Sequence, residues 1–170
     1  MLFRSLKGGD PFLFGRGGEE MLTLRAAGFA VEVVNGLTAG IAVPATLGIP
    51  VTHRGLAAGV TFVTARAGSQ GSAEPDWAAL ARTGTTLVIY MGLARLPEIS
   101  AALQAAGLPG ATPAAVIAHG SLPSQREVTG HLDGIAQAAR AAALPAPALI
   151  VIGAVAALAA PRQELLRHAA

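Results

Sequence analysis

The sequence predicts an α/β fold, and three observations support this prediction. Short apolar runs rich in β-branched residues alternate with helical patterns along almost all of the 170 residues. Glycine, asparagine and proline mark the boundaries between these patterns. Hydrophobic residues make up 52% of the chain and charged residues only 13%, which predicts a folded chain with a buried core rather than a disordered one. The length suits one ordinary domain, or a small domain with part of another.

The first block of the sequence, up to about residue 54, contains few elements. We expect strands at residues 2–6 and 30–34 and helices at residues 19–27 and 38–47. Gly28 ends the first helix, Thr38 can cap the second, and Pro44 can kink it. Two strands and two helices cannot cover both faces of a parallel sheet. Further polypeptide, from upstream or from another subunit, is therefore expected to complete this block.

The second block contains enough elements for a complete domain. Asp76 is placed to cap a short helix, and Gly107 to end a longer one. An uncharged stretch at residues 141–160 is interrupted by Pro145 and Pro147, which favours a buried strand over a membrane span. The expected elements are strands at 60–64, 86–90, 114–118, 126–129 and 148–152 and helices at 77–82, 93–106 and 132–144.

Composition excludes several kinds of function. The chain has no cysteine, so disulfides, zinc–thiolate sites and cysteine nucleophiles are excluded, and no metal is expected. The net charge is +2, without a run of like charges, which disfavours nucleic-acid binding. Only Lys7 among the 12 basic residues is a lysine; arginine suits carboxylates and phosphates, although a coding bias explains this as well. The N-terminal residues contain no long apolar stretch, so we expect no signal peptide and a cytoplasmic protein.

The most informative stretch is residues 7–20, KGGDPFLFGRGGEE. Five glycines in eleven residues allow the backbone to approach a ligand closely. The stretch follows a predicted strand and precedes a predicted helix, which is where α/β sheets bind ligands. It matches neither the dinucleotide-binding fingerprint nor the P-loop spacing. From the residues alone, a structural turn and a ligand-binding loop are equally good interpretations.

This stretch resembles the signature of the uroporphyrinogen III methyltransferases, within the tetrapyrrole methylase family. The Gly-Asp-Pro core is similar across the family, and the continuation Phe-x-Phe-Gly-Arg-Gly-Gly-Glu-Glu is typical of this subfamily. The similarity continues over nearly the whole chain. Further matches are Val33-Val34, Gly36 to Ala39, Gly48 to Arg54, Val60 to Thr64, Asp76-Trp77, Leu87 to Gly92, Gln125-Arg126 and Pro147 to Gly153.

The resemblance implies a tetrapyrrole-methylase-like fold of two α/β domains. Residues 1–54 would be the remnant of an incomplete N-terminal parallel-sheet domain, residues 55–160 a complete C-terminal mixed-sheet domain, and residues 161–170 a tail. The implied activity is the S-adenosylmethionine-dependent C-methylation of uroporphyrinogen III to precorrin-2, on the way to sirohaem and cobalamin. The implied assembly is a homodimer, with the cofactor between the domains.

The resemblance also implies site residues, matched motif by motif. Two arginines are candidates for the carboxylates of the tetrapyrrole, Arg16 and Arg54, with Arg66 a weaker third; solvated or structural roles are the alternatives. Met91 would otherwise be a core residue and Thr38 a helix cap. The implied cofactor contacts are Gly8, Gly9, Asp10, Leu13, Thr38, Ala39, Met91 and Gly120.

The sequence departs from the family pattern in two places that bear on function. An earlier strand with a Gly-x-Gly-Pro-Gly-Asp turn and the upstream acid–base residues are missing, so the catalytic residues are expected in that portion. We therefore expect the isolated chain to be nearly inactive; the alternative is an inactive remnant that acts only as a dimerising or binding module. Residues 118–121 read Ala-His-Gly-Ser where the family has Glu-Asn-Gly or Ala-Thr, and His119 is either a surface histidine or a group that titrates near neutrality.

Overall fold

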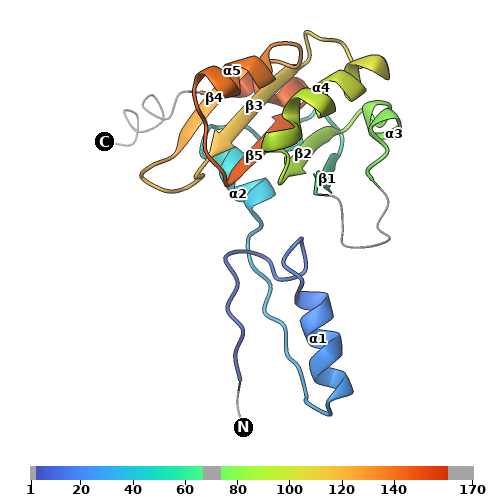
Figure 1. Ribbon diagram of the computed structural model, residues 1–170, viewed down its shortest axis with the longest axis vertical. Coiled ribbons are helices and arrows are strands. Elements are labelled where there is room, and N and C mark those ends of the chain that lie inside the picture. The colour runs from blue at the N-terminus through green and yellow to red at the C-terminus, as the bar shows by residue number, and fades with distance from the viewer. Residues whose placement is uncertain (1–2, 67–73, 161–170) are drawn as a thin grey trace. The chain divides into compact units, whose positions relative to one another are not determined.

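A computed structural model describes residues 3–66 and 74–160 of the chain (Figure 1). The chain divides into two compact units, the N-terminal unit Met1–Ala39 and the C-terminal unit Gly40–Ala170. The expected domain boundary after residue 54 stays a prediction. The predicted tail at residues 161–170 lies outside the described residues.

Among the described residues of the N-terminal unit, helix α1 at Gly17–Ala26 is the one regular element. Glu19 and Glu20 lie in its first turn, where the helix dipole favours negative charge. The helix ends at Ala26, one residue before the predicted end, and Gly28 follows the C-cap with a φ of +84°, which is accessible to glycine without strain. The amide of Phe29 donates to the carbonyl of Leu24 at 3.1 Å, which completes a Schellman cap.

The two strands predicted in the N-terminal unit are absent. Residues 3–6 and 30–34 have no regular secondary structure, and residue 2 lies outside the described part of the chain. The strand predictions are therefore wrong for this chain. The physical reason is that a strand exists only by pairing, and these segments have no partner within the described residues. Their apolar side chains stay exposed, including 91% of Leu6 and 79% of Val34.

The C-terminal unit is built on one five-stranded sheet. Its strand order is β1-β2-β5-β3-β4. Strands β1 and β2 pair in parallel, and the remaining pairs, β2 with β5, β5 with β3 and β3 with β4, are antiparallel. The sheet is therefore mixed, as predicted. The strands are β1 Val60–Thr64, β2 Thr86–Tyr90, β3 Pro113–Ala118, β4 Arg126–His131 and β5 Ala148–Ile152.

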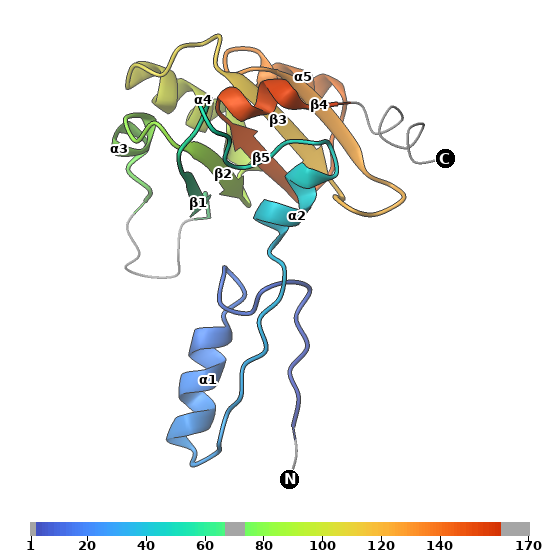
Figure 2. The ribbon, with the colours of Figure 1, turned by 180° about the vertical axis from the view of Figure 1, so that it is seen from behind.

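Alternate residues of the central strands supply two cores, one on each face of the sheet. In β2, Leu87 and Ile89 belong to one core and Val88 to the other. Figures 1 and 2 show the two faces in turn, with α4 and α5 over the first and η2 over the second. The helical elements are α2 Ala39–Ala45, α3 Trp77–Ala81, η1 Leu93–Arg95, α4 Leu96–Ala105, α5 Ile135–Ala141 and η2 Ala154–Leu158.

The helices of this unit are shorter than predicted. The helix predicted at 93–106 is divided into η1 and α4, and the helix predicted at 132–144 is α5, which starts at Ile135 and ends at Ala141. The Asp76 carboxylate accepts a hydrogen bond from the Ala79 amide at 2.8 Å and caps α3, as predicted. Helix α2 ends at Ala45, before the predicted end at residue 47, and Pro44 lies inside it. In the described ranges, no helix has the length and apolar character needed to cross a membrane. The apolar stretch near the C-terminus instead contains the buried strand β5.

Candidate functional site

The glycine-rich segment of the N-terminal unit folds into a turn that Asp10 holds closed. One carboxylate oxygen of Asp10 accepts a hydrogen bond from the Phe12 amide at 2.8 Å, and the other accepts one from the Gly36 amide at 3.3 Å. The first bond is an Asx turn, and the second joins two segments that lie 26 residues apart. We name this arrangement, residues 8–18 with 36–38, the glycine corner.

Close backbone approach in the glycine corner requires glycine at defined positions. A Cβ atom on Gly36 would lie 2.6 Å from the carbonyl oxygen of Gly9, and one on Gly9 would lie 3.2 Å from the carbonyl oxygen of Leu37. A Cβ on Gly17 would lie 2.5 Å from the carbonyl oxygen of Pro11, which accepts the Gly17 amide at 2.8 Å. These contacts explain why Gly9, Gly17 and Gly36 are glycines, whether or not a ligand binds.

One part of the glycine corner remains open. A Cβ on Gly8 would meet nothing within 4 Å, Ala39 is exposed, and Leu13 is half-buried. Thr38 is buried and stands directly before α2, in the position predicted for a cap. The glycine corner therefore exposes backbone N–H and C=O groups at Gly8, beside a turn whose shape is fixed. Exposed backbone groups of this kind suit a polar ligand.

In the C-terminal unit, residues other than glycine adopt positive φ angles at the ends of two strands. Strands β1, β2 and β3 run in the same direction, so their carboxyl ends lie at one edge of the sheet. Met91 follows β2 with a φ of +55°, and His119 follows β3 with a φ of +50°. Such conformations cost on the order of 1–3 kcal/mol in non-glycine residues and cluster at functional sites. We name this edge the carboxyl edge.

Met91 is not a core residue. Its side chain is 48% exposed, although Met91 directly follows strand β2, whose residues are all buried or half-buried. The strand leading into it is apolar, and an apolar side chain there would ordinarily continue the core. The interpretation of Met91 as a core residue is therefore wrong, and its role as a cofactor contact stays a prediction.

Helix α2 is fastened to the carboxyl edge at two points. At the end of β2, the Gly40 amide donates a hydrogen bond to the hydroxyl of Tyr90. At the end of β3, a Cβ on Gly120 would lie 2.4 Å from a methyl group of Val43, so only glycine permits this approach. Gln125 adds a further tie: it accepts from the Ser121 amide at 2.8 Å and donates to the Thr46 hydroxyl at 3.0 Å.

The ring of His119 is bonded at both nitrogens. Nε2 lies 3.2 Å from the carbonyl oxygen of Ala146, and Nδ1 lies 3.3 Å from the hydroxyl of Ser124. Since a carbonyl can only accept, Nε2 is the donor to Ala146, whereas the Ser124 hydroxyl can either donate to Nδ1 or accept from it. The side chain is half-buried, and both ring nitrogens lie near polar groups of the same unit.

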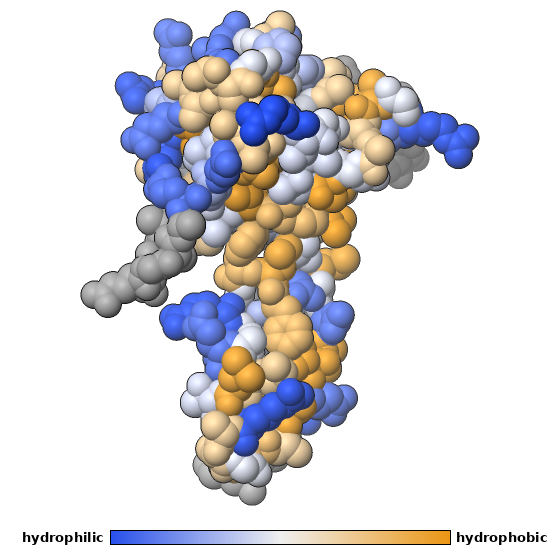
Figure 3. Space-filling view, turned by 90° about the vertical axis from the view of Figure 1, so that its right-hand side faces the viewer, coloured by the Kyte–Doolittle hydropathy of each residue, from blue (hydrophilic) through white to orange (hydrophobic). Residues whose placement is uncertain are grey.

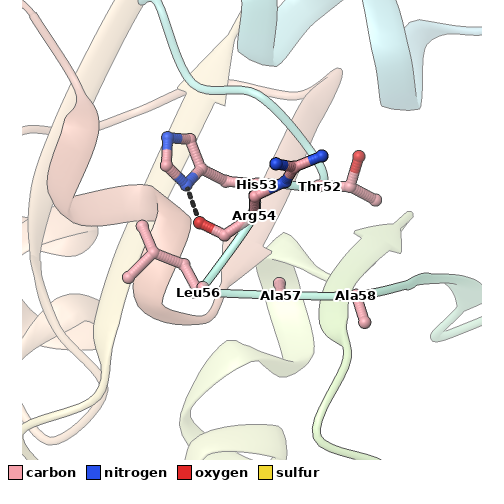
Figure 4. Close-up of a pocket in the computed structure, with 7 residues that line it drawn as sticks. Thr52, His53, Arg54, Leu56, Ala57 and Ala58 are labelled. Carbon is pink, nitrogen blue, oxygen red and sulfur yellow. Dashed lines mark hydrogen bonds between the residues drawn. The ribbon is translucent and has the colours of Figure 1, made fainter.

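The two candidate arginines have different environments. The Arg16 guanidinium pairs with the Glu19 carboxylate at 2.7 Å, and the hydrogen bond from this pair raises the pKa of Arg16 above its ordinary value. Its side chain is 79% exposed, which fits a solvated ion pair. Arg54 is exposed on the loop of residues 52–58, which lines an open depression (Figure 4). In that loop, Nδ1 of His53 lies 2.8 Å from the carbonyl oxygen of Arg54.

The structure groups the predicted residues into two sets, one in each unit. Gly8, Gly9, Asp10, Leu13, Thr38 and Ala39 belong to the N-terminal unit, with Arg16. Met91 and Gly120 belong to the carboxyl edge, while Arg54 lies on a separate loop of the C-terminal unit and Arg66 follows β1. Their binding roles stay predictions. No group of three potential metal-ligating side chains occurs in the described part of the chain.

Sequence reasoning missed Tyr90 and Gln125, which hold α2 in place. One signal for Tyr90 was available, because it is the only tyrosine of the chain and it ends an apolar strand. A phenol at such a position usually has a hydrogen-bond partner.

Comparison with known proteins gives concordant results from sequence and structure. Residues 5–136 match the family described as Tetrapyrrole (Corrin/Porphyrin) Methylases. The chain is 50% identical over 148 residues to the uroporphyrinogen-III C-methyltransferase of Pseudomonas aeruginosa and 47% identical over 148 residues to the sirohaem synthase of Gluconacetobacter diazotrophicus. A solved structure of the Thermus thermophilus uroporphyrin-III C-methyl transferase, complexed with S-adenyl homocysteine, matches with a TM-score of 0.75 and 39% identity.

The matches cover most of this chain but only part of each relative. They cover 87% of this chain and 60% of the P. aeruginosa protein, 87% of this chain and 32% of the G. diazotrophicus protein, and 88% of this chain and 64% of the T. thermophilus chain. The chain thus spans about three fifths of the length of the P. aeruginosa relative.

Proposed function

The chain belongs to the tetrapyrrole methylase family, and we propose that it contributes the glycine corner and the C-terminal domain of an S-adenosylmethionine-dependent C-methyltransferase. The proposed reaction converts uroporphyrinogen III to precorrin-2 in tetrapyrrole biosynthesis. The observation that supports it best is that the family match includes the glycine corner, whose fold is fixed by Asp10 and Gly36. We place the protein in the cytoplasm and expect a homodimer.

The residues present fit the proposed methyl donor. At the glycine corner, Gly8 leaves open space beside backbone groups that can both donate and accept hydrogen bonds. At the carboxyl edge, Met91 offers an exposed apolar side chain, and Gly120, whose missing Cβ makes room for Val43 of α2, can contribute backbone groups. When bound, S-adenosylmethionine would supply an electrophilic methyl group on sulfur.

The chain's own residues act chiefly by positioning. Transfer of a methyl group from a sulfonium requires donor and acceptor in line, and such alignment can contribute about 7–11 kcal/mol. Gly8, Gly9 and Asp10 would hold the donor through backbone and carboxylate contacts, and Met91 would limit its movement. Arg54, exposed and outside the ion pairs of the described residues, is the better candidate for a tetrapyrrole carboxylate. Arg16 is already neutralised by Glu19.

Methyl transfer is tested by complementation. The chain is mixed with a polypeptide that corresponds to the part of the P. aeruginosa relative it does not match, and transfer from S-adenosylmethionine to uroporphyrinogen III is followed. We expect the mixture to be active and the chain alone to be nearly inactive. A Gly36→Val chain, in which the new side chain meets the carbonyl of Gly9, should fail to complement. Turnover by the isolated chain would contradict the expected impairment, and a mixture that assembles without turnover would contradict the proposed reaction.

A second candidate function is an inactive dimerising or binding module. The observation that favours it is the exposed apolar surface of the N-terminal unit, part of which is visible in Figure 3. Its exposed large apolar residues are Phe3, Leu6, Phe12, Phe14, Leu22, Phe29, Val34 and Leu37. Sedimentation velocity over a range of concentrations separates the two functions. Two results together would favour the binding module: self-association that is lost in the Leu6→Ser and Leu37→Ser variants, and no methyl transfer in the complementation assay.

A further inference from the structure

The only tyrosine of the chain links two segments that the proposed function assigns to the cofactor. The Tyr90 hydroxyl accepts the hydrogen bond from the Gly40 amide, across a separation of 50 residues. Gly40 directly follows Ala39, and Tyr90 directly precedes Met91. Each partner of this bond is therefore one peptide bond away from a proposed cofactor contact.

The environment of the bond fixes the position of both partners. The rings of Tyr90 and Phe62 meet edge to face, with centroids 6.5 Å apart and planes at 74°. A Cβ on Gly40 would lie 2.5 Å from the Tyr90 hydroxyl and 2.6 Å from the Phe62 ring, so no larger residue fits. The Gly40 amide lies in the first turn of α2, where no carbonyl of the same helix can accept it. Tyr90 supplies the missing acceptor in a partly buried setting.

We propose that Tyr90 is a positioning residue for the methyl donor: its hydroxyl fixes the first turn of α2 at the carboxyl end of β2. This inference rests on the proposed function. Gln125 and Gly120 hold the later part of α2 at the end of β3, so Tyr90 is responsible for the turn that directly follows Thr38 and Ala39. Loss of the hydroxyl should release that turn while the rest of the helix stays in place.

The test uses Tyr90→Phe in the full chain, which keeps the ring against Phe62 and removes only the hydroxyl. Thr129→Val is the matched control, because it removes a hydroxyl from exposed strand β4, on the far edge of the sheet. In the wild type and both variants, amide exchange is measured by NMR and the affinity for S-adenosylhomocysteine by chemical-shift titration. We expect Tyr90→Phe to speed exchange of the Gly40 amide about 10-fold and to weaken binding about 3- to 10-fold. Thr129→Val should change neither.

Each outcome has a defined meaning. If Tyr90→Phe binds S-adenosylhomocysteine as tightly as the wild type, the positioning role is wrong, even if thermal stability falls, because a purely structural bond affects only stability. If affinity falls while Gly40 exchange is unchanged, the mechanism through α2 is wrong. If the wild type shows no shifts at Gly40, Met91 or Gly120, in isolation and with the complementing polypeptide, the proposed function fails and this inference fails with it.

Discussion

Asp10 and Gly36 are joined by a hydrogen bond from the Gly36 amide to the Asp10 carboxylate, at 3.3 Å. The same carboxylate also accepts from the Phe12 amide at 2.8 Å. Both carboxylate oxygens are thus used within the glycine corner. Asp10 therefore stabilises the glycine corner whether or not a ligand is bound.

The first prediction concerns this carboxylate. Asp10→Ala should speed amide exchange at Phe12 and Gly36, because both amides lose their acceptor. We expect a loss of about 0.5–1.5 kcal/mol in local stability for each bond, at the lower end because the site is exposed. Exchange measured by NMR checks this, with Glu32→Ala as control, an exposed carboxylate of the same unit that forms no ion pair among the described residues. Unchanged exchange in Asp10→Ala would show that the corner is held by other contacts.

The second prediction compares two glycines of the same unit. Gly36→Ala places a methyl group 2.6 Å from the Gly9 carbonyl, so the corner must open and its amide resonances should shift. Gly18→Ala, in the first turn of α1, meets nothing within 4 Å and should stabilise the helix by about 0.5–1 kcal/mol. Spectra of both variants and helix content by circular dichroism measure the contrast. Equal effects of the two changes would contradict the close approach of the backbones at Gly36.

The third prediction tests the contact of α2 with the end of β3. Gly120→Ala brings a methyl group to 2.4 Å from Val43 and should lower the free energy of unfolding by about 1–3 kcal/mol. Val43→Ala in the same chain removes the obstructing methyl groups, so the double variant should lose less than the sum of the single changes. Urea unfolding of the four chains measures the coupling.

Gly130→Ala controls for glycine replacement in general. Gly130 is in β4, where a new Cβ would meet only one side-chain atom, at 4.0 Å. Its effect should not depend on Val43. Additive losses in the Gly120 and Val43 cycle would mean that the two residues are not in the contact described.

The C-terminal unit could be predicted well from sequence, because its signals are local and its partners are present. The five strands, the Asp76 cap and the glycine at the end of α4 each follow from a short pattern. The strand at 30–34 has an equally clear pattern and did not form. Periodicity reports which residues suit a strand, but pairing decides whether a strand exists.

The candidate site was predictable in part, and only with the help of resemblance. The glycines of residues 8–18 are visible in the sequence, but their contacts with Gly36 and Pro11 are long-range or turn-specific and have no sequence signal. The same holds for the bond between Tyr90 and Gly40, since nothing local relates a strand end to a helix start 50 residues away. The positive φ of Met91, which follows an apolar strand, likewise has no signal in the sequence.

The fourth prediction concerns pH and the ion pair of Arg95 with Glu74. Two guanidinium nitrogens of Arg95 donate to the two carboxylate oxygens of Glu74 at 2.9 and 3.0 Å, and this hydrogen bonding lowers the pKa of Glu74 below its ordinary value of 4.5. A carboxyl whose pKa is lower in the folded chain stabilises the fold above its unfolded pKa. The stabilisation should persist at neutral pH and disappear as the pH falls below 4.5 and through the folded pKa.

Glu74→Gln isolates this contribution. Urea unfolding of the wild type and the variant over a series of pH values should show the wild type more stable near neutrality, with a difference that shrinks to zero in acid. Glu127→Gln, on β4 and outside the ion pairs of the described residues, should show no such pH-dependent difference. Because Arg95 also donates to the Ala65 carbonyl at 2.9 Å, the guanidinium should stay in place in the variant, and the loss should be confined to the charge of Glu74. A difference that grows in acid would have the wrong sign for a lowered carboxyl pKa and would rule out this ion pair as its source.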